Sequence, residues 1–239
     1  MGICYRRIGE LDSSLIYYKK GIQKAIKSEN AEYEIYLYNC ISVLFNEQKR
    51  FREAIEYSDK AESKAIAIND TIERLSAHAN KGAILMRQGN YRKSVNSLTS
   101  MWNMVKQANY NVLTLKYLSP LLKSYLQLGK ADSVAFYLTY ANEACRNLAP
   151  TSNGVLGILE IKADLLGQQK KYAEQWLLLD SIGRLAGTNL TMPKDKLLAT
   201  QARCLKNMGK YTQAYPAMQK AYMKSDSPKQ SDIDKQLSE

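Results

Sequence analysis

The sequence has 239 residues, of which 45% are hydrophobic and 24% charged, with 12 Gly and 5 Pro. This apolar fraction is ordinary for a folded protein and excludes an intrinsically disordered chain. No run of about 18 apolar residues occurs, which excludes a transmembrane helix in this sequence. A single His and four separated Cys offer little material for catalysis. The composition therefore indicates a folded protein but gives no sign of an enzyme.

The formal net charge is +11, from 34 Lys and Arg against 23 Asp and Glu. A basic balance of this size favours an acidic partner, whether a peptide, a nucleic acid or an anionic lipid. The basic residues are dispersed, often interleaved with Glu, and no run of five occurs. Solvated helix faces that keep the protein soluble are the alternative explanation, and charge alone does not decide between them.

The four cysteines show no metal-ligand spacing and no Cys-x-x-Cys motif. Each lies in an apolar helical stretch, where a free thiol behaves as a small hydrophobe. We therefore expect four buried thiols, at positions Cys4, Cys40, Cys145 and Cys204.

Short turn-like segments recur along the whole chain at a nearly fixed interval. Their second residues lie 40, 40, 40, 41 and 39 residues apart. Most of them are Gly, which ends a helix well because it adopts the left-handed conformation without a side-chain clash. In chain order these residues are Gly9, Lys49, Gly89, Gly129, Lys170 and Gly209.

Apolar or small residues recur at three- and four-residue spacing on both sides of each turn, as in amphipathic helices. Two helices of about 17 residues and two short turns account for one period. The sequence therefore predicts an all-α solenoid of five full helix pairs after a leading half pair. The expected repeats of this single array, residues 1–225, are 1–30, 31–70, 71–110, 111–150, 151–191 and 192–225. Residues 226–239 are expected to begin a capping or connector helix.

The helix pairs share a further pattern of large, small and aromatic residues around each turn. The first pair has Gly2 and Tyr5 before its turn, and Ser14, Tyr18 and Gly21 after it. The same register holds Ser42, Phe45, Ala54 and Ser58 in the second pair, Gly82, Tyr91, Ser94 and Leu98 in the third, and Ala202, Tyr211, Ala214 and Ala221 in the last.

This pattern resembles the tetratricopeptide repeat (TPR) over residues 1–225, in a form about six residues longer than the usual 34. The resemblance implies a right-handed superhelix in which small residues let neighbouring helices approach closely. The fourth and fifth repeats depart from the pattern, with Leu122, Val134 and Gln175 at small positions. Looser or re-angled packing is expected there.

The resemblance also implies a concave groove, lined by the first helices of successive pairs, that binds a peptide or a partner helix. A carboxylate clamp for a peptide C-terminus is not expected, because only Asn80 and Lys116 match its five positions. The candidate groove residues are Arg6, Tyr36, Asn39, Val43, Ala79, Ala83, Met86, Lys116, Lys123, Leu126, Glu160, Asp164, Arg203 and Lys206.

No catalytic, metal or cofactor site is expected. His78 lies where the repeat places a large packing residue, and no phosphate-binding or dinucleotide-binding glycine motif occurs. The sequence thus predicts a non-catalytic protein- or peptide-binding module with no cofactor.

Three settings for such a module remain open. The long period resembles the sensor regions of membrane-anchored regulators in Bacteroides-like bacteria, which would place this part of the chain in the periplasm, beside a fused output domain. A freestanding cytoplasmic adaptor is the alternative. A nucleic-acid binder with a basic groove is the third, although the groove positions hold few stacking aromatics and an acidic patch.

Overall fold

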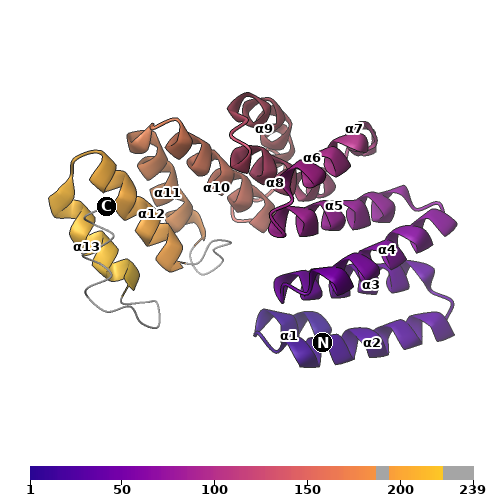
Figure 1. Ribbon diagram of the computed structural model, residues 1–239. Helices are drawn as coiled ribbons and strands as arrows, with labels where there is room; N and C mark the ends of the chain where they lie inside the picture. Colours follow the sequence, from indigo (N-terminus) through magenta and orange to yellow (C-terminus); the bar gives the residue numbers. More distant parts are fainter. Residues whose placement is uncertain (187–193, 223–239) are drawn as a thin grey trace. The chain divides into compact units, whose positions relative to one another are not determined.

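The computed structural model describes residues 1–186 and 194–222 (Figure 1), and these residues form thirteen α-helices and no strand. The all-α fold expected from the sequence is therefore confirmed. The helices are α1 (Gly2–Arg7), α2 (Leu11–Lys27), α3 (Ala31–Glu47), α4 (Phe51–Ala67), α5 (Thr71–Arg87), α6 (Tyr91–Ser100), α7 (Trp102–Ala108), α8 (Asn111–Gln127), α9 (Ala131–Cys145), α10 (Asn153–Gln168), α11 (Tyr172–Ala186), α12 (Lys194–Asn207) and α13 (Tyr211–Tyr222). The expected helix in residues 226–239 lies outside the described residues.

The chain divides into two compact units, Met1–Lys130 and Ala131–Glu239. In unit 1, α3 packs against α4 and α5 packs against α6, while α2, α3, α5 and α8 also contact the pairs before or after them. In unit 2, α10 packs against α11 and α12 against α13, and α11 joins the two pairs. Apart from α8 and α9, the helices of each unit therefore form pairs that stack on their neighbours, as in a helical-repeat protein.

The turn within each helix pair has the predicted conformation. All six predicted turn residues have positive φ, including Lys49 at 59° and Lys170 at 60°. In the second pair the Lys49 N–H donates to the Asn46 carbonyl at 3.1 Å and the Arg50 N–H donates to the Phe45 carbonyl at 2.9 Å. The same two bonds recur at the other five turns, so each first helix ends in a Schellman motif.

The starts of several first helices are fixed by side-chain caps. The Asn30 side chain accepts a hydrogen bond from the Tyr33 N–H at 2.9 Å, and the Asp70 side chain accepts one from the Glu73 N–H at 2.9 Å. Ser152 caps α10 in the same way through the Val155 N–H. These caps satisfy backbone donors that the helix itself leaves unpaired.

The second helix of the third pair differs from the expectation of one 17-residue helix. It is broken at Met101 into α6 of 10 residues and α7 of 7. Just before the break, the Thr99 hydroxyl donates to the Val95 carbonyl at 2.9 Å and the Ser100 hydroxyl to the Ser97 carbonyl at 2.6 Å. Hydroxyl bonds of this kind to a carbonyl one turn earlier favour a bend in a helix.

Small residues bring the two helices of a pair together, as the repeat pattern predicts. The buried Ser14 hydroxyl donates to the Gly2 carbonyl at 2.9 Å, and Ser94 donates to the Gly82 carbonyl at 2.8 Å. A Cβ added at Gly82 would lie 2.4 Å from the Leu98 side chain. The glycine is therefore required by the closeness of α5 and α6 rather than by a turn.

Gln175, a departure from the small-residue pattern, is accommodated by another glycine. A Cβ on Gly167 would lie 2.7 Å from the Gln175 amide nitrogen, so the long side chain occupies the space above this glycine. The Cys204 thiol donates to the Gln175 amide oxygen at 3.1 Å. Gln175 therefore packs among α10, α11 and α12 with its buried oxygen paired.

The prediction of four buried thiols is wrong for Cys4, which is exposed, whereas Cys204 is buried and Cys40 and Cys145 are half-buried. Cys4 lies on α1, a helix of 6 residues in which Gly2 is the only buried residue. His78, in contrast, has the packing role that was predicted. Its ring stacks on Tyr117 with centroids 6.2 Å apart, and Nε2 lies 3.0 Å from the Ser97 carbonyl.

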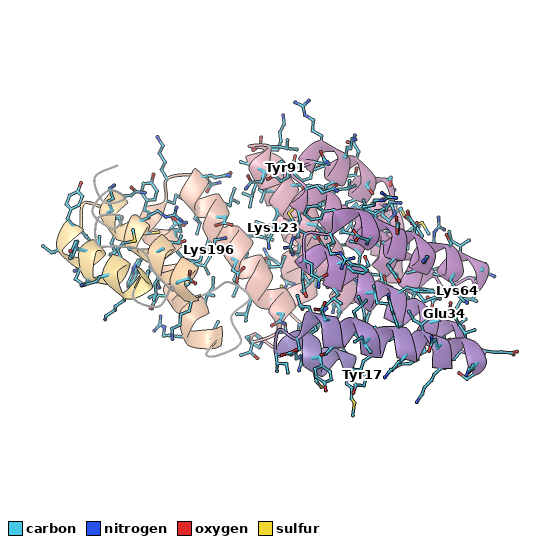
Figure 2. The ribbon with its side chains drawn as sticks, turned by 60° about the horizontal axis from the view of Figure 1, so that its bottom comes forward. Tyr17, Glu34, Lys64, Tyr91, Lys123 and Lys196 are labelled. Carbon is cyan, nitrogen blue, oxygen red and sulfur yellow. The ribbon has the colours of Figure 1, made fainter. Side chains whose placement is uncertain are left out.

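A partly buried ion pair ties α3 to α4 (Figure 2). The Lys64 amine donates to the Glu34 carboxylate, which also accepts a hydrogen bond from the Tyr38 hydroxyl at 2.7 Å. Burial, together with this bond to the carboxylate, raises the pKa of Tyr38 to about 12. The paired Lys64 and Tyr38 groups compensate the burial of the Glu34 charge.

Candidate functional site

The first helices of unit 1, α1, α3, α5 and α8, carry an ordered set of polar side chains on one face. Tyr36, Ser76 and Lys116 occupy the same position in three successive repeats, 40 residues apart. We call the surface of α1, α3, α5 and α8 around Tyr36, Ser76 and Lys116 the first-helix face. Ten of the fourteen predicted groove residues lie on these four helices.

The centre of the first-helix face is a hydrogen-bonded network that joins α3 to α5. The buried Asn39 amide donates to the Glu73 carboxylate at 2.8 Å and accepts from the Asn80 amide at 2.8 Å. The Asn39 side chain is therefore held by two partners on the neighbouring repeat. Networks of this kind fix one geometry, because breaking either bond leaves a buried polar group unpaired.

Lys116 extends the network from α5 to α8. Its amine donates to the Ser76 hydroxyl and interacts with the charge of Glu73. Burial lowers the pKa of Lys116 to about 8, although the Glu73 charge opposes this change. Burial also raises the pKa of the Glu73 carboxyl, against the effects of Lys116 and Asn39. The two groups are thus partly desolvated charges that stabilise each other.

Cys40 lies on the same face near the phenols of Tyr18 and Tyr36. Burial raises the pKa of the Cys40 thiol, while the nearby Tyr36 hydroxyl and the charge of Arg6 oppose the rise. Burial likewise raises the pKa of Tyr36 to about 12. A thiol with a raised pKa is protonated near neutral pH and is a poor nucleophile. Cys40 is half-buried and packs beside the two phenols.

Exposed aromatic and apolar side chains border the network. Tyr33 and Tyr36 stack with ring centroids 6.1 Å apart and an interplanar angle of 14°. They are 48% and 40% exposed, respectively. Val43 and Met86 on the first helices are half-buried. The face thus combines a buried polar floor with a solvent-accessible aromatic edge.

The predicted groove residues of unit 1 divide into two groups. Asn39, Ala79 and Leu126 are buried, so their side chains support the face from below. The accessible ones are exposed or half-buried, and Arg6 also lies 4.0 Å from the Glu47 carboxylate on α3. This accessible group is Arg6, Tyr36, Val43, Ala83, Met86, Lys116 and Lys123.

The predicted groove residues of unit 2 are dispersed over α10 and α12. Glu160 is buried, Lys206 is half-buried, and Asp164 and Arg203 are exposed. The Arg203 guanidinium donates to the Thr200 hydroxyl one turn earlier, at 3.2 Å.

Sequence reasoning missed Glu73 and Ser76, two central members of the network. Glu73 follows the cap residue Asp70 by three positions, a spacing typical of a capping box, in which the glutamate bonds back to its own helix start. Instead its carboxylate reaches Asn39 on the preceding first helix. Ser76 could have been found, because it shares the repeat position of Tyr36 and Lys116.

Two further observations concern other kinds of site. Among the described residues, no group of three or more His, Cys, Asp or Glu side chains is arranged to hold a metal ion. No helix in the described part of the chain has both the length and the apolar character needed to cross a membrane.

Comparisons with known proteins agree with the fold. No protein-family model matches the sequence, and no curated protein matches it. Among solved structures, the crystal structure of BtubC (BKLC) from P. vanneervenii matches with a TM-score of 0.67 and 14% identity, over 92% of this chain and 94% of that chain. The fold therefore defines an all-helical repeat protein.

Proposed function

We propose that this protein is a non-catalytic helical-repeat module that binds a protein or peptide on the first-helix face of unit 1. The observation that carries the proposal is the double hydrogen bonding of the Asn39 amide to Glu73 and Asn80. This network holds three first helices in one arrangement below an accessible surface. A pre-organised surface binds with less loss of conformational entropy than a flexible one.

The accessible residues of the face suit a protein ligand. The stacked pair of Tyr33 and Tyr36 offers a large, rigid contact area, and tyrosines are enriched among the residues that contribute most to interface affinity. Basic residues of the face lie beside carboxylates, as Arg6 does beside Glu47 and Lys116 beside Glu73. This mixed charge favours a protein over a nucleic acid, whose phosphates select for an excess of positive charge.

We further propose that the repeats are TPRs. The 40-residue period of the turns and the glycine and serine contacts, such as Ser94 to Gly82, support this assignment. In this family the first helices line the concave surface, which would place the first-helix face at the floor of the ligand groove.

Photo-crosslinking tests the proposed binding face. The photoreactive amino acid p-benzoylphenylalanine replaces Tyr36 in one variant and Ile66 in the other, and both are irradiated in the native cells. Ile66 is 50% exposed on the second helix α4, so it is an accessible control outside the first helices. We expect a crosslinked protein at Tyr36 that is absent at Ile66. Identical crosslinking at both positions would contradict the proposal.

We also propose that the module is the sensory region of a larger receptor, because its sequence resembles the sensor regions of bacterial regulators. Fractionation of native cells, probed with an antibody to this domain, tests it. A band much larger than 27.1 kDa in the membrane fraction supports a sensory region in a larger receptor. A soluble band near 27.1 kDa supports the alternative, a freestanding adaptor.

A further inference from the structure

Unit 2 contains an apolar pocket that belongs to none of the first-helix positions discussed above. The pocket has a volume of about 220 Å³ and lies between the start of α11, the end of α12 and the start of α13. A dry cavity of about 150 Å³ is large enough to bind benzene, so this space accepts a side chain of leucine or phenylalanine size. Its lining includes Ala173, Trp176, Leu177, Leu205, Met208 and Lys210.

Two residues of the lining lie at second-helix positions whose residue types vary among the repeats, and Leu177 shares its position with the exposed Ile16 and Phe136. Ala173 and Leu177 follow the turn residue Lys170 by three and seven positions. The residues that follow Lys49 by the same numbers are Arg52 and Glu56, which form an ion pair at 3.4 Å on the surface of α4. The repeat architecture does not require apolar residues here, yet Leu177 is 58% exposed.

On the first-helix side of the pocket, the equivalent residues of the second pair contact each other. Phe45 occupies the position of Leu205, and Arg50 that of Lys210. The Arg50 guanidinium lies 4.3 Å from the centre of the Phe45 ring, and it also pairs with Glu53 at 2.7 Å. In unit 2 the corresponding side chains line an open pocket instead.

The two turns that border the pocket are basic. Residues 168–174 and 206–213 contain four lysines and one glutamate. Lys210 itself lines the pocket, and both α11 and α13 begin at this edge, so the positive ends of their dipoles lie there. An apolar pocket with a basic rim complements an apolar side chain that has carboxylates beside it.

We propose that this pocket binds a leucine or phenylalanine side chain of a partner protein, presented by a segment with acidic residues on both sides. This site lies on unit 2, at the turn between first and second helices, and is independent of the first-helix face of unit 1. The apolar side chain fills the space above Trp176, Leu205 and Met208. Lys210 and the neighbouring lysines bind the flanking carboxylates.

A peptide titration tests the proposal. Trp176 is one of two tryptophans, so a Trp102→Phe background makes its fluorescence the reporter of the pocket. The probes are the peptide acetyl-Glu-Asp-Leu-Glu-Asp-amide, the same peptide with Ala in place of Leu, and a third with Lys in place of the four acidic residues. We expect the leucine peptide to bind about tenfold or more tightly than either of the others.

Two variants and a matched control locate the site. The double variant Ala173→Arg with Leu177→Glu introduces the residue types that the second pair has at the equivalent positions, Arg52 and Glu56. We expect it to abolish the fluorescence change. Gln213→Glu, which adds a negative charge to the lining, should weaken binding severalfold without filling the pocket. Phe136→Glu removes an apolar side chain on α9 that is 55% exposed, and should leave binding unchanged.

Three results would contradict the binding of an acidic segment of a partner protein in this pocket. Equal affinity for the leucine and alanine peptides, or no saturable signal up to about 1 mM peptide, would overturn the proposal. Analytical ultracentrifugation gives a further check. A dimer of the wild-type protein that Ala173→Arg with Leu177→Glu dissociates would assign the pocket to a second copy of this chain instead.

Discussion

The Ser42 hydroxyl on α3 donates a hydrogen bond to the Ala54 carbonyl on α4 at 2.8 Å. In the first and third pairs the direction is reversed, since Ser14 and Ser94 on the second helices donate to carbonyls on the first. Either helix can therefore supply the hydroxyl, provided that the opposing residue is small. The bond replaces the side-chain contact that larger residues would make at this position.

Ala54→Trp should destabilise the second pair. Ala54 is fully buried against α3, and an indole there would force the two helices apart. We expect a loss of about 1–3 kcal/mol or more in the free energy of unfolding, measured by thermal or urea denaturation. Ala67→Trp, at an exposed position on the same helix, is the control. An unchanged melt for Ala54→Trp would contradict the helix register described above.

Lys49→Gly should stabilise the protein. Lys49 has a φ of 59°, a region in which a side chain clashes with the backbone and glycine does not. Release of this strain should add about 0.5–1 kcal/mol to the free energy of unfolding, partly offset by the greater freedom of glycine in the unfolded chain. The reverse change Gly89→Ala, at a φ of 80°, should destabilise by a similar amount. If both variants changed the free energy of unfolding in the same direction, the backbone strain at positive φ would not explain the changes.

The turns could be predicted from sequence because their chemistry is local. Gly9 and Gly89 identify the left-handed position directly, and the period extends it to Lys49, whose own side chain gives no such signal. The Asn39 network depends on how far one repeat is rotated against the next, which no local pattern encodes. The same limit explains why Leu126 was expected on the accessible face and is instead buried.

Lys116 should make stability depend on pH in a defined window. Burial lowers the pKa of its amine to about 8 in the folded protein, from 10.5. Between these values the unfolded chain holds a proton that the folded chain has released, so the free energy of unfolding rises with pH. Below pH 8 both states are protonated, and the destabilising effect of the buried charge is fully present.

Lys116→Met removes this dependence. The difference in unfolding free energy between wild type and variant should shift in favour of the wild type by up to about 1.4 kcal/mol per pH unit between pH 8 and 10. Urea denaturation of both proteins at pH 7.5 and 9.5 measures it, since tyrosines and thiols that titrate in both proteins cancel in the difference. Parallel pH profiles would show that the Lys116 amine is not desolvated.

The four thiols should react with iodoacetamide at separate rates. Cys4 is exposed and should react first, whereas Cys204 is buried, with its thiol pKa raised by burial to about 11. We expect Cys204 to react at least about tenfold more slowly than Cys4 at pH 8, because the thiolate is the reactive form. Mass spectrometry of peptides taken over time measures both rates. In urea the difference should disappear; if it persists there, its origin is not the fold.

The most direct test of the binding face is the affinity of the protein crosslinked at Tyr36 for two charge-reversed variants. Lys123→Glu changes an accessible lysine on the first helix α8, and Lys19→Glu makes the same change on the second helix α2. We predict that Lys123→Glu weakens binding by about tenfold or more, while Lys19→Glu changes it less than about twofold. Equal effects of the two variants would contradict a binding site on the first-helix face.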